Sequence, residues 1–244
     1  MQLKYKILYI TALVLITGCE FEINDSEAPN PYVRHKTLEL DDGKIMDFAL
    51  ILPEYTEPGM IHPVLLTFGG GGQSMPEILY NLGQFWVRQS IQRNWIVVSP
   101  VAVEGTKYYE GSEKYVTQLL DWVRDNFEVE EDKFHLSGFS NGGKSAFRVA
   151  LENTDQFLSL MVMPGVLATD TEYALLDRLI GIPVHLYVGQ YEIDEWKNKM
   201  DSIKVVLDSV GVENKFREFP GQGHVIQTLT SKMLFDTLDT FRND

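Results

Sequence analysis

The chain has 244 residues, of which 44% are hydrophobic, so it can bury a sizeable core within a single domain. Its 35 acidic residues outnumber its 21 basic ones and give a formal net charge of −14. This balance, with no run of Lys or Arg, argues against nucleic-acid binding by phosphate neutralisation and identifies no substrate.

The N-terminal residues predict a processing signal rather than part of the fold. Lys4 and Lys6 precede the apolar run ILYITALVLI, which is too short to span a membrane comfortably. The sequence ITGC at residues 16–19 then resembles the lipobox of bacterial lipoproteins. That resemblance implies cleavage before Cys19 and lipidation of its thiol. Because Cys19 is the only cysteine, no intrachain disulfide can form.

We therefore expect a signal peptide over residues 1–18, a flexible tether over residues 19–31 and a folded domain over residues 32–244. The tether is expected because EFEINDSEAPNP is polar, acidic and poor in apolar residues. The lipobox resemblance implies a lipid-anchored protein of the bacterial cell envelope, on either its periplasmic or its surface face.

Strand-like runs come next. YVRHKTLEL and IMDFALILP flank the pair Asp42-Gly43, which predicts an antiparallel hairpin. Six further apolar runs predict strands: PVLLTF, WIVVSP, KFHLSGF, LSLMVMP, PVHLYVG and KFREFP. Continuous apolar runs of this kind are typical of a sheet that helices cover on both faces. We expect an α/β fold with a mostly parallel, eight-stranded sheet.

Amphipathic segments between these runs predict helices. The clearest is KYVTQLLDWVRDNF, which has an apolar face of Val116, Leu119, Leu120, Val123 and Phe127. Ser74, Pro76 and Glu77 predict a capping-box start for another helix. Gly211 is expected to end a helix that begins near Trp196. The segment VIQTLTSKMLFDTLDTF is expected to form the last helix of the chain.

Residues 138–142, GFSNG, match the pattern G-x-S-x-G between a predicted strand and a predicted helix. In this context the pattern predicts a nucleophile elbow, a strained turn that presents the Ser140 hydroxyl at the end of the sheet. Glycines flank the serine because side chains at those positions would collide with neighbouring backbone. The alternative is an ordinary glycine-rich turn in which Ser140 has no catalytic role.

A serine hydroxyl is a poor nucleophile at neutral pH, so Ser140 needs a histidine base within reach. Of the five histidines, three lie within predicted strands and His62 precedes one. His224 instead lies in PGQGHVIQ, between the last strand and the last helix. It is the expected base, and the alternative is that it only caps the following helix.

A carboxylate should hold the imidazole of the base in the required tautomer. The loop after the strand PVHLYVG offers Glu192, Asp194 and Glu195. We expect one of Glu192 and Asp194 to be this acid, while the remaining carboxylates form a solvated face.

Backbone N–H groups are also needed to stabilise the oxyanion that develops at an acyl carbon. The glycine run at residues 69–72 follows a predicted strand, so Gly70 and Gly71 are expected donors, together with Asn141 immediately after the serine. A phosphate-binding loop is disfavoured because no Lys-Ser or Lys-Thr pair follows the glycines. A flexible turn without function is the remaining alternative.

From residue 32 to the C-terminus the chain resembles the α/β-hydrolase family. KFHLSGFSNGGKSAF is similar to secreted esterases that include polyhydroxybutyrate-depolymerase-like, feruloyl and acetylxylan esterases. The order Ser140, acid, His224 matches the family order. Acid loops of the family usually read G-x-x-D, which favours Glu192, three residues after Gly189, over Asp194.

Two features depart from the family pattern. Phe68-Gly69 stands where the family commonly has His-Gly in the oxyanion loop, which leaves the amides available but removes a side chain that often supports the loop. Only GVLATDTEYALLDRLIGI lies where many relatives insert a lid, so we expect a minimal lid and an open site. Tyr108, Tyr109 and Trp196 are expected near that site as substrate-binding residues for a sugar or an aryl group, with ordinary packing as the alternative.

These interpretations predict a serine esterase that acts through an acyl-enzyme without a cofactor or metal. The resemblance implies acyl or feruloyl esters of carbohydrates as substrates. A serine peptidase or an acyltransferase of the same fold would use the same residues, and a surface binding module that has lost catalysis is an alternative of another class. The sequence indicates no oligomeric state.

Overall fold

In the computed structural model of this chain, residues 30–242 are described. The predicted signal peptide, Cys19 and all of the predicted tether before Asn30 lie outside the described residues. Between residues 30 and 242, no helix is long and apolar enough to cross a membrane. From Pro31 onward these residues form one compact unit.

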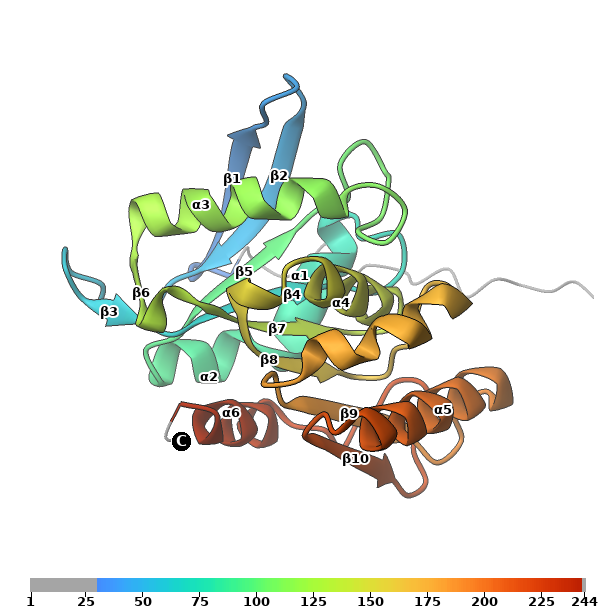
Figure 1. Ribbon diagram of the computed structural model, residues 1–244. Coiled ribbons are helices and arrows are strands. Elements are labelled where there is room, and N and C mark those ends of the chain that lie inside the picture. The colour runs from blue at the N-terminus through green and yellow to red at the C-terminus, as the bar shows by residue number, and fades with distance from the viewer. Residues whose placement is uncertain (1–29, 243–244) are drawn as a thin grey trace, which may run out of the picture. The chain divides into compact units, whose positions relative to one another are not determined.

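A central eight-stranded sheet has the order β1-β2-β5-β4-β7-β8-β9-β10. Its strands are β1 (Val33–Glu39), β2 (Ile45–Ile51), β4 (Val64–Phe68), β5 (Ile96–Pro100), β7 (Phe134–Gly138), β8 (Phe157–Val162), β9 (Val184–Gly189) and β10 (Asn214–Phe219). β2 is antiparallel to both β1 and β5, and the other neighbours are parallel. The predicted α/β fold is confirmed. Figure 1 shows the β1–β2 hairpin at the top and β10 at the bottom.

A second, smaller sheet pairs β3 (Ile61–His62) with β6 (Glu128–Val129) in parallel. The sequence analysis did not predict it. Each of these strands has 2 residues, which is too short for an alternating pattern to be visible in the sequence.

Helices connect the strands. The α-helices of the described residues are α1 (Met75–Phe85), α2 (Val87–Gln92), α3 (Val116–Asn126), α4 (Asn141–Glu152), α5 (Asp194–Val210) and α6 (Ser231–Thr240). The 3-10 helices are η1 (Glu113–Tyr115), η2 (Glu130–Asp132), η3 (Thr154–Gln156) and η4 (Asp170–Leu179). η4 occupies the segment between β8 and β9, and it packs against α4 and α5. This segment therefore extends a helical layer.

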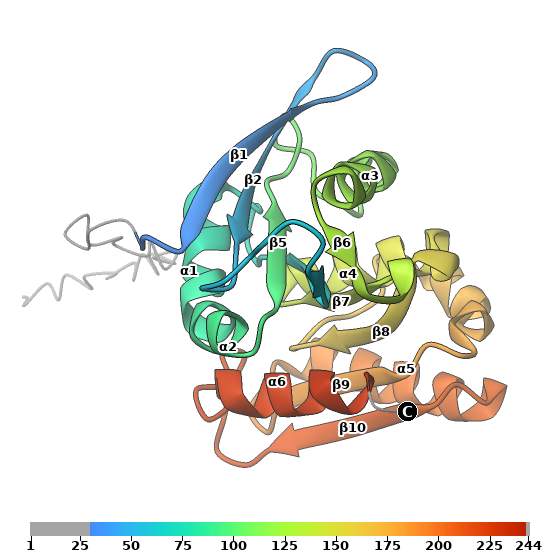
Figure 2. The ribbon, with the colours of Figure 1, turned by 90° about the vertical axis from the view of Figure 1, so that its left-hand side faces the viewer.

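Apolar side chains fill both faces of the sheet. All residues of β4, β5, β7 and β9 are buried, as expected for strands between two helical layers. One apolar cluster includes residues of α1, α2 and α6, and the other includes residues of α3, α4 and α5. Figure 2 shows α1 and α2 on one side of the sheet and α3 and α4 on the other.

Local sequence determines where two of the helices begin or end. The predicted capping box starts α1, because the Glu77 carboxylate accepts hydrogen bonds from the Ser74 amide at 2.8 Å and the Ser74 hydroxyl at 2.7 Å. Gly211 ends α5 in the left-handed conformation, with φ of 81°. Both ends agree with the prediction.

The last helix is shorter than predicted. α6 begins at Ser231 rather than near Val225. Thr230 caps it by accepting a hydrogen bond from the Met233 amide at 3.3 Å, and Ile226 is buried in the preceding turn. The apolar pattern continued across this turn, which is why the sequence suggested a longer helix.

Parallel pairing brings four loops to one edge of the sheet. Phe68 at the end of β4 lies opposite Gly138 at the end of β7, and Phe219 at the end of β10 lies opposite Gly189 at the end of β9. The glycine run, the elbow, the acid loop and the histidine loop follow these four strands. Segments far apart in the sequence therefore meet where α/β sheets usually bind their ligands.

Candidate active site

Ser140 lies on the turn between β7 and α4 in a strained conformation. Its φ of 58° and ψ of −121° are rare outside glycine, and its amide donates to the Pro164 carbonyl at 2.8 Å. The flanking glycines permit the turn. A β-carbon on Gly138 would overlap the Gly142 carbonyl, and a β-carbon on Gly142 would overlap the Phe68 carbonyl. The strand–turn–helix geometry is that of a nucleophile elbow.

Ser140, His224 and Glu192 form a continuous hydrogen-bonded relay. Ser140 Oγ lies 2.8 Å from His224 Nε2, and Glu192 Oε2 lies 2.8 Å from His224 Nδ1. When Nδ1–H donates to the carboxylate, Nε2 can accept the proton of the serine hydroxyl. The three side chains come from the loops after β7, β9 and β10, so only the folded sheet brings them together.

Of the two acids expected from the sequence, the structure brings Glu192 to the histidine. The Glu192 side chain is fully buried, and its second oxygen, Oε1, accepts a hydrogen bond from the Ile193 amide at 2.9 Å. Asp194 is exposed and is the first residue of α5. A carboxylate at that place interacts favourably with the helix dipole. Asp194 therefore lies outside the relay.

The glycine run packs against the elbow. A β-carbon on Gly70 would lie 3.3 Å from the Ser140 β-carbon, which places the Gly70 backbone beside the serine. The Asn141 side chain holds the run, because its Nδ2 donates to the Gly71 carbonyl at 2.9 Å. Within residues 30–242, the backbone amides of Gly70, Gly71 and Asn141 donate to no acceptor. They are available for an oxyanion.

Gln73 supports this loop, and the sequence analysis did not identify it. Its buried side chain donates from Nε2 to Ser145 Oγ at 2.7 Å and accepts the Tyr108 amide at 3.1 Å. Its own amide donates to the Gly70 carbonyl at 3.1 Å. Gln73 therefore connects the glycine run to α4 and to the loop after β5. A polar residue directly after four glycines was the available signal.

Phe68 stands where the family commonly has histidine, and it packs in the core. It is fully buried, and its ring centroid lies 4.8 Å from that of Tyr108. Tyr108 is also buried, and its hydroxyl donates to the Val101 carbonyl at 2.9 Å. Burial raises the pKa of the Tyr108 hydroxyl well above its ordinary value. The prediction that Tyr108 binds substrate is therefore wrong, because its ring packs behind the glycine run.

Tyr109 and Trp196 are partly exposed, and Trp196 lies next to the relay. The Trp196 ring centroid is 5.2 Å from the His224 ring, at an interplanar angle of 82°. Lys144 Nζ lies 5.4 Å from the Tyr109 ring centroid and 5.2 Å from that of Trp196. Two of the three aromatic residues expected at the site are thus grouped around one lysine beside the histidine.

The described residues contain no candidate metal site, and a hollow at β9, β10 and α6 lies away from the relay. Between residues 30 and 242, no group of three or more His, Cys, Asp and Glu side chains could hold a metal ion.

A cavity of about 560 Å³ is lined by residues of β9, β10 and α6, among them His185, Lys215 and Asp236. None of its lining residues belongs to the relay, so it is not part of this site.

The sheet is mostly parallel, the serine lies on a strand–helix elbow, and the acid and the histidine lie on later loops. This combination defines the serine hydrolases of the α/β-hydrolase fold. The family model Esterase, described as "Putative esterase", matches residues 43–214, which is more than half of the chain. The chain belongs to this esterase family. The matched residues include Ser140 and Glu192 and end before His224.

Similar proteins include esterases and peptidases. Dipeptidyl aminopeptidase A of Saccharomyces cerevisiae is 23% identical over 220 residues, covering 77% of this chain and 23% of the yeast protein. The chain therefore spans less than a quarter of that relative. An S-formylglutathione hydrolase from Agrobacterium tumefaciens has a TM-score of 0.69 at 16% identity, covering 86% of this chain and 94% of that one. A ferulic acid esterase has a TM-score of 0.64 at 16% identity, with coverages of 86% and 97%. These likenesses show the fold.

Proposed function

We propose that this protein hydrolyses carboxylic esters through an acyl-enzyme on Ser140. The observation that carries the proposal is the relay, in which both nitrogens of His224 lie 2.8 Å from their partners. A geometry of this kind activates a serine without a cofactor. Membership of an esterase family supports an ester as the substrate.

The first half of the reaction forms the acyl-enzyme. His224 Nε2 takes the hydroxyl proton as Ser140 Oγ attacks the ester carbonyl, and the buried Glu192 carboxylate stabilises the imidazolium that results. The amides of the glycine run and of Asn141 donate hydrogen bonds to the oxyanion. The tetrahedral intermediate then collapses, and the imidazolium passes its proton to the departing alcohol.

The second half releases the acid. Water enters after the alcohol has left, and His224 Nε2 removes a proton from it as its oxygen attacks the acyl carbon. Collapse of the second intermediate returns the proton to Ser140 Oγ and frees the carboxylic acid. An acyltransferase would share every step and use another alcohol in place of water, so products formed with added alcohols or sugars distinguish the two activities.

For the substrate class we propose acyl or feruloyl esters of carbohydrates. The structural likeness to a ferulic acid esterase supports this at the level of the fold, and the partly exposed Trp196 ring beside His224 offers a surface for a sugar or an aryl group. Replacement Trp196→Ala is expected to raise KM for glycosyl and aryl esters. An unchanged KM for both kinds of ester contradicts the assignment of Trp196.

A serine peptidase is the second candidate, because the yeast relative is an aminopeptidase. The match covers 23% of that protein, so its activity is for this chain a proposal to be tested. Turnover of dipeptide p-nitroanilides at a rate above that of p-nitrophenyl butyrate would favour the peptidase.

The intact relay of Ser140, His224 and Glu192 argues against the other alternative, a binding module that has lost catalysis.

The test is hydrolysis of p-nitrophenyl acetate and butyrate by the wild-type protein and by Ser140→Ala and His224→Ala. Each variant is expected to lose about 10³-fold or more in kcat, as removal of a nucleophile or base does. Ser202→Ala is the matched control, because Ser202 is exposed on α5 and its hydroxyl donates to the Asn198 carbonyl at 2.8 Å, within the same helix. A fluorophosphonate should label the wild type and not Ser140→Ala. Equal activity of wild type and Ser140→Ala contradicts the proposal.

We also propose attachment to the bacterial cell envelope through a lipid on Cys19. The lipobox-like ITGC sequence supports this, although it lies outside the described residues. Cells fed radiolabelled palmitate should label the wild-type protein, and Cys19→Ser should abolish the label and move the protein to the soluble fraction. Membrane retention and labelling of Cys19→Ser would contradict the anchor.

A further inference from the structure

Lys144 lies one helical turn after the serine and points its ammonium at two aromatic rings. Lys144 belongs to the first turn of α4, where its backbone amide donates to the Ser140 carbonyl at 3.4 Å. Its Nζ lies 5.4 Å from the centroid of Tyr109 and 5.2 Å from that of Trp196, within the range of cation–π attraction. Trp196 in turn lies 5.2 Å from the His224 ring. A single indole therefore contacts both the ammonium and the proposed base.

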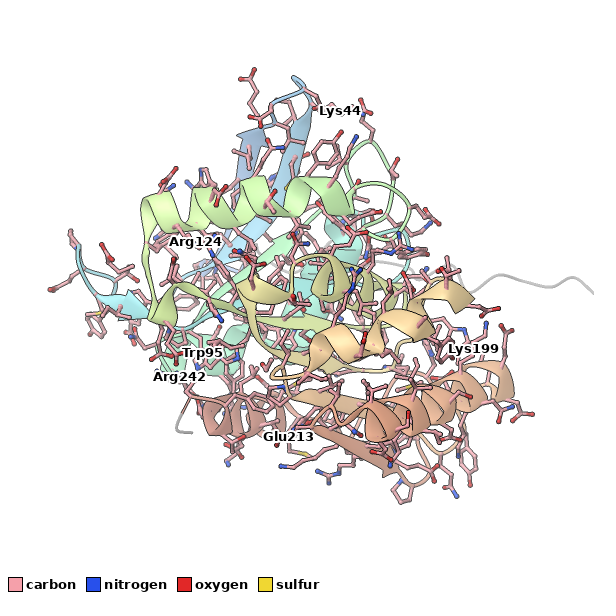
Figure 3. All side chains as sticks on the ribbon, in the orientation of Figure 1. Lys44, Trp95, Arg124, Lys199, Glu213 and Arg242 are labelled. Carbon is pink, nitrogen blue, oxygen red and sulfur yellow. The ribbon has the colours of Figure 1, made fainter. Side chains whose placement is uncertain are left out.

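The lysines around Lys144 have carboxylate partners, whereas Lys144 has none. Lys107 pairs with Glu110 at 3.2 Å, and Lys199, labelled in Figure 3, pairs with Glu195 at 2.8 Å. Among residues 30–242, the Lys144 ammonium forms neither an ion pair nor a hydrogen bond. The carboxylates nearest to this group of lysines are thus already engaged.

The surroundings of Lys144 favour binding of an anion. Burial lowers the pKa of its ammonium, and the charges of Lys199 and Lys107 lower it further, while the carboxylates of Glu110 and Glu195 act in the opposite direction. A partly desolvated cation between two rings recovers solvation when an anion binds, and the rings restrict its rotamers before binding. The group is a preorganised cationic site beside the serine, on a chain whose formal net charge is −14.

We propose that Lys144, held between Tyr109 and Trp196, binds an anionic group of the substrate and makes the enzyme prefer esters that carry a carboxylate. This inference rests on the proposed esterase function and names its substrate class more closely. The two rings attract the ammonium, and its three N–H groups can donate hydrogen bonds to the carboxylate. The same ammonium repels the protonated N-terminus of a peptide, which argues against aminopeptidase activity.

The test uses pairs of esters that differ only in charge. The first pair has the charge on the acyl side: the mono-p-nitrophenyl ester of adipic acid and its neutral amide, p-nitrophenyl adipamate. The second has it on the alcohol side: the butyrate esters of 3-hydroxybenzoate and of neutral 3-hydroxybenzamide. The ratio of kcat/KM within a pair cancels any general loss of activity in a variant.

The wild-type protein is expected to prefer the carboxylate in at least one pair by about tenfold, as a charge-assisted hydrogen bond at a partly buried site provides. Lys144→Met should bring that ratio close to one, Lys144→Arg should keep most of it, and Lys144→Glu should invert it. The preference should also fall as salt is raised. Lys232→Met is the matched control, since it removes one positive charge on α6 and should leave the ratio unchanged.

Two results would overturn the inference while leaving the esterase proposal intact. One is a wild-type ratio near one in both pairs, with hydrolysis that still depends on Ser140. The other is a preference for the carboxylate that survives Lys144→Met. Absence of any Ser140-dependent hydrolysis of the neutral esters contradicts the proposed function itself, and this inference with it.

Discussion

Glu192 Oε2 lies 2.8 Å from His224 Nδ1, and the two side chains differ sharply in exposure. The glutamate side chain is fully buried, while that of the histidine is 38% exposed. The buried carboxylate, which also accepts the Ile193 amide, orients the imidazole, and the exposed edge of that ring remains accessible to a substrate. The pair therefore explains how a loop histidine is held in position for Ser140.

Replacing Glu192 should cost far more activity than replacing Asp194. Glu192→Gln puts an amide against Nδ1 and favours the wrong tautomer of His224, so kcat for p-nitrophenyl butyrate should fall by about 10²-fold or more. Asp194→Asn should change kcat less than about twofold, because Asp194 is exposed at the start of α5. A larger loss for Asp194→Asn than for Glu192→Gln would show that Asp194 is the acid.

Removing the buried amide of Gln73 should affect both stability and rate. Gln73→Leu leaves the Ser145 hydroxyl and the Tyr108 amide without this partner, which should lower the free energy of unfolding by about 2–4 kcal/mol. The displaced glycine run should lower kcat by about 10-fold or more while KM changes little. Urea unfolding and steady-state kinetics measure the two effects. Gln84→Leu, at an exposed position of α1, is the control, and an equal kcat for both variants would contradict this role.

Breaking the buried ion pair between α4 and η4 should destabilise the fold. Arg148 Nε donates to the Glu172 carboxylate at 2.5 Å, and Glu172 is only 3% exposed. Arg148→Met leaves that carboxylate without its counter-charge, so the free energy of unfolding should fall by about 3 kcal/mol. Lys232→Met breaks an exposed pair and should cost less than about 1 kcal/mol. Equal effects of the two changes in urea unfolding would contradict this difference.

Stability should fall on acidification through His135. Burial lowers the pKa of His135 to about 4, and the positive charge of nearby Arg242 acts in the same direction. Its ring lies 4.9 Å from that of Trp95, which Figure 3 shows beside Arg242. The unfolded chain takes up a proton near the ordinary pKa of 6.5, so the stability due to neutral His135 is complete above 6.5 and is lost as pH falls towards 4.

The measurement compares wild type with His135→Phe. Between pH 7 and pH 5 the wild type should lose about 2 kcal/mol more of its free energy of unfolding than the variant, which keeps an aromatic ring but cannot titrate. The variant also leaves the Ser159 hydroxyl without its partner, and this lowers its stability equally at every pH. Parallel pH dependences for the two proteins would show that His135 does not contribute.

Part of the structure followed from local sequence. Apolar runs predicted six strands of the main sheet, and two strand-like runs around Asp42-Gly43 predicted the other two. Ser74 and Gly211 marked helix ends, because backbone conformation depends on near neighbours. The glycines around Ser140 predicted the elbow for the same reason: the steric requirement of the turn lies within a few residues. The sequence also identified His224 as the expected base, because the other four histidines lie in or before predicted strands.

Other features were decided only when the strands paired. Glu192 and Asp194 are two residues apart, and the choice between them depends on which side of the loop after β9 faces the loop after β10. Tyr108 and Tyr109 are adjacent in sequence, yet one is buried behind the glycine run and the other borders Lys144. Parallel strands bring distant loops to one edge of the sheet, and contacts between such loops have no local signature in the sequence.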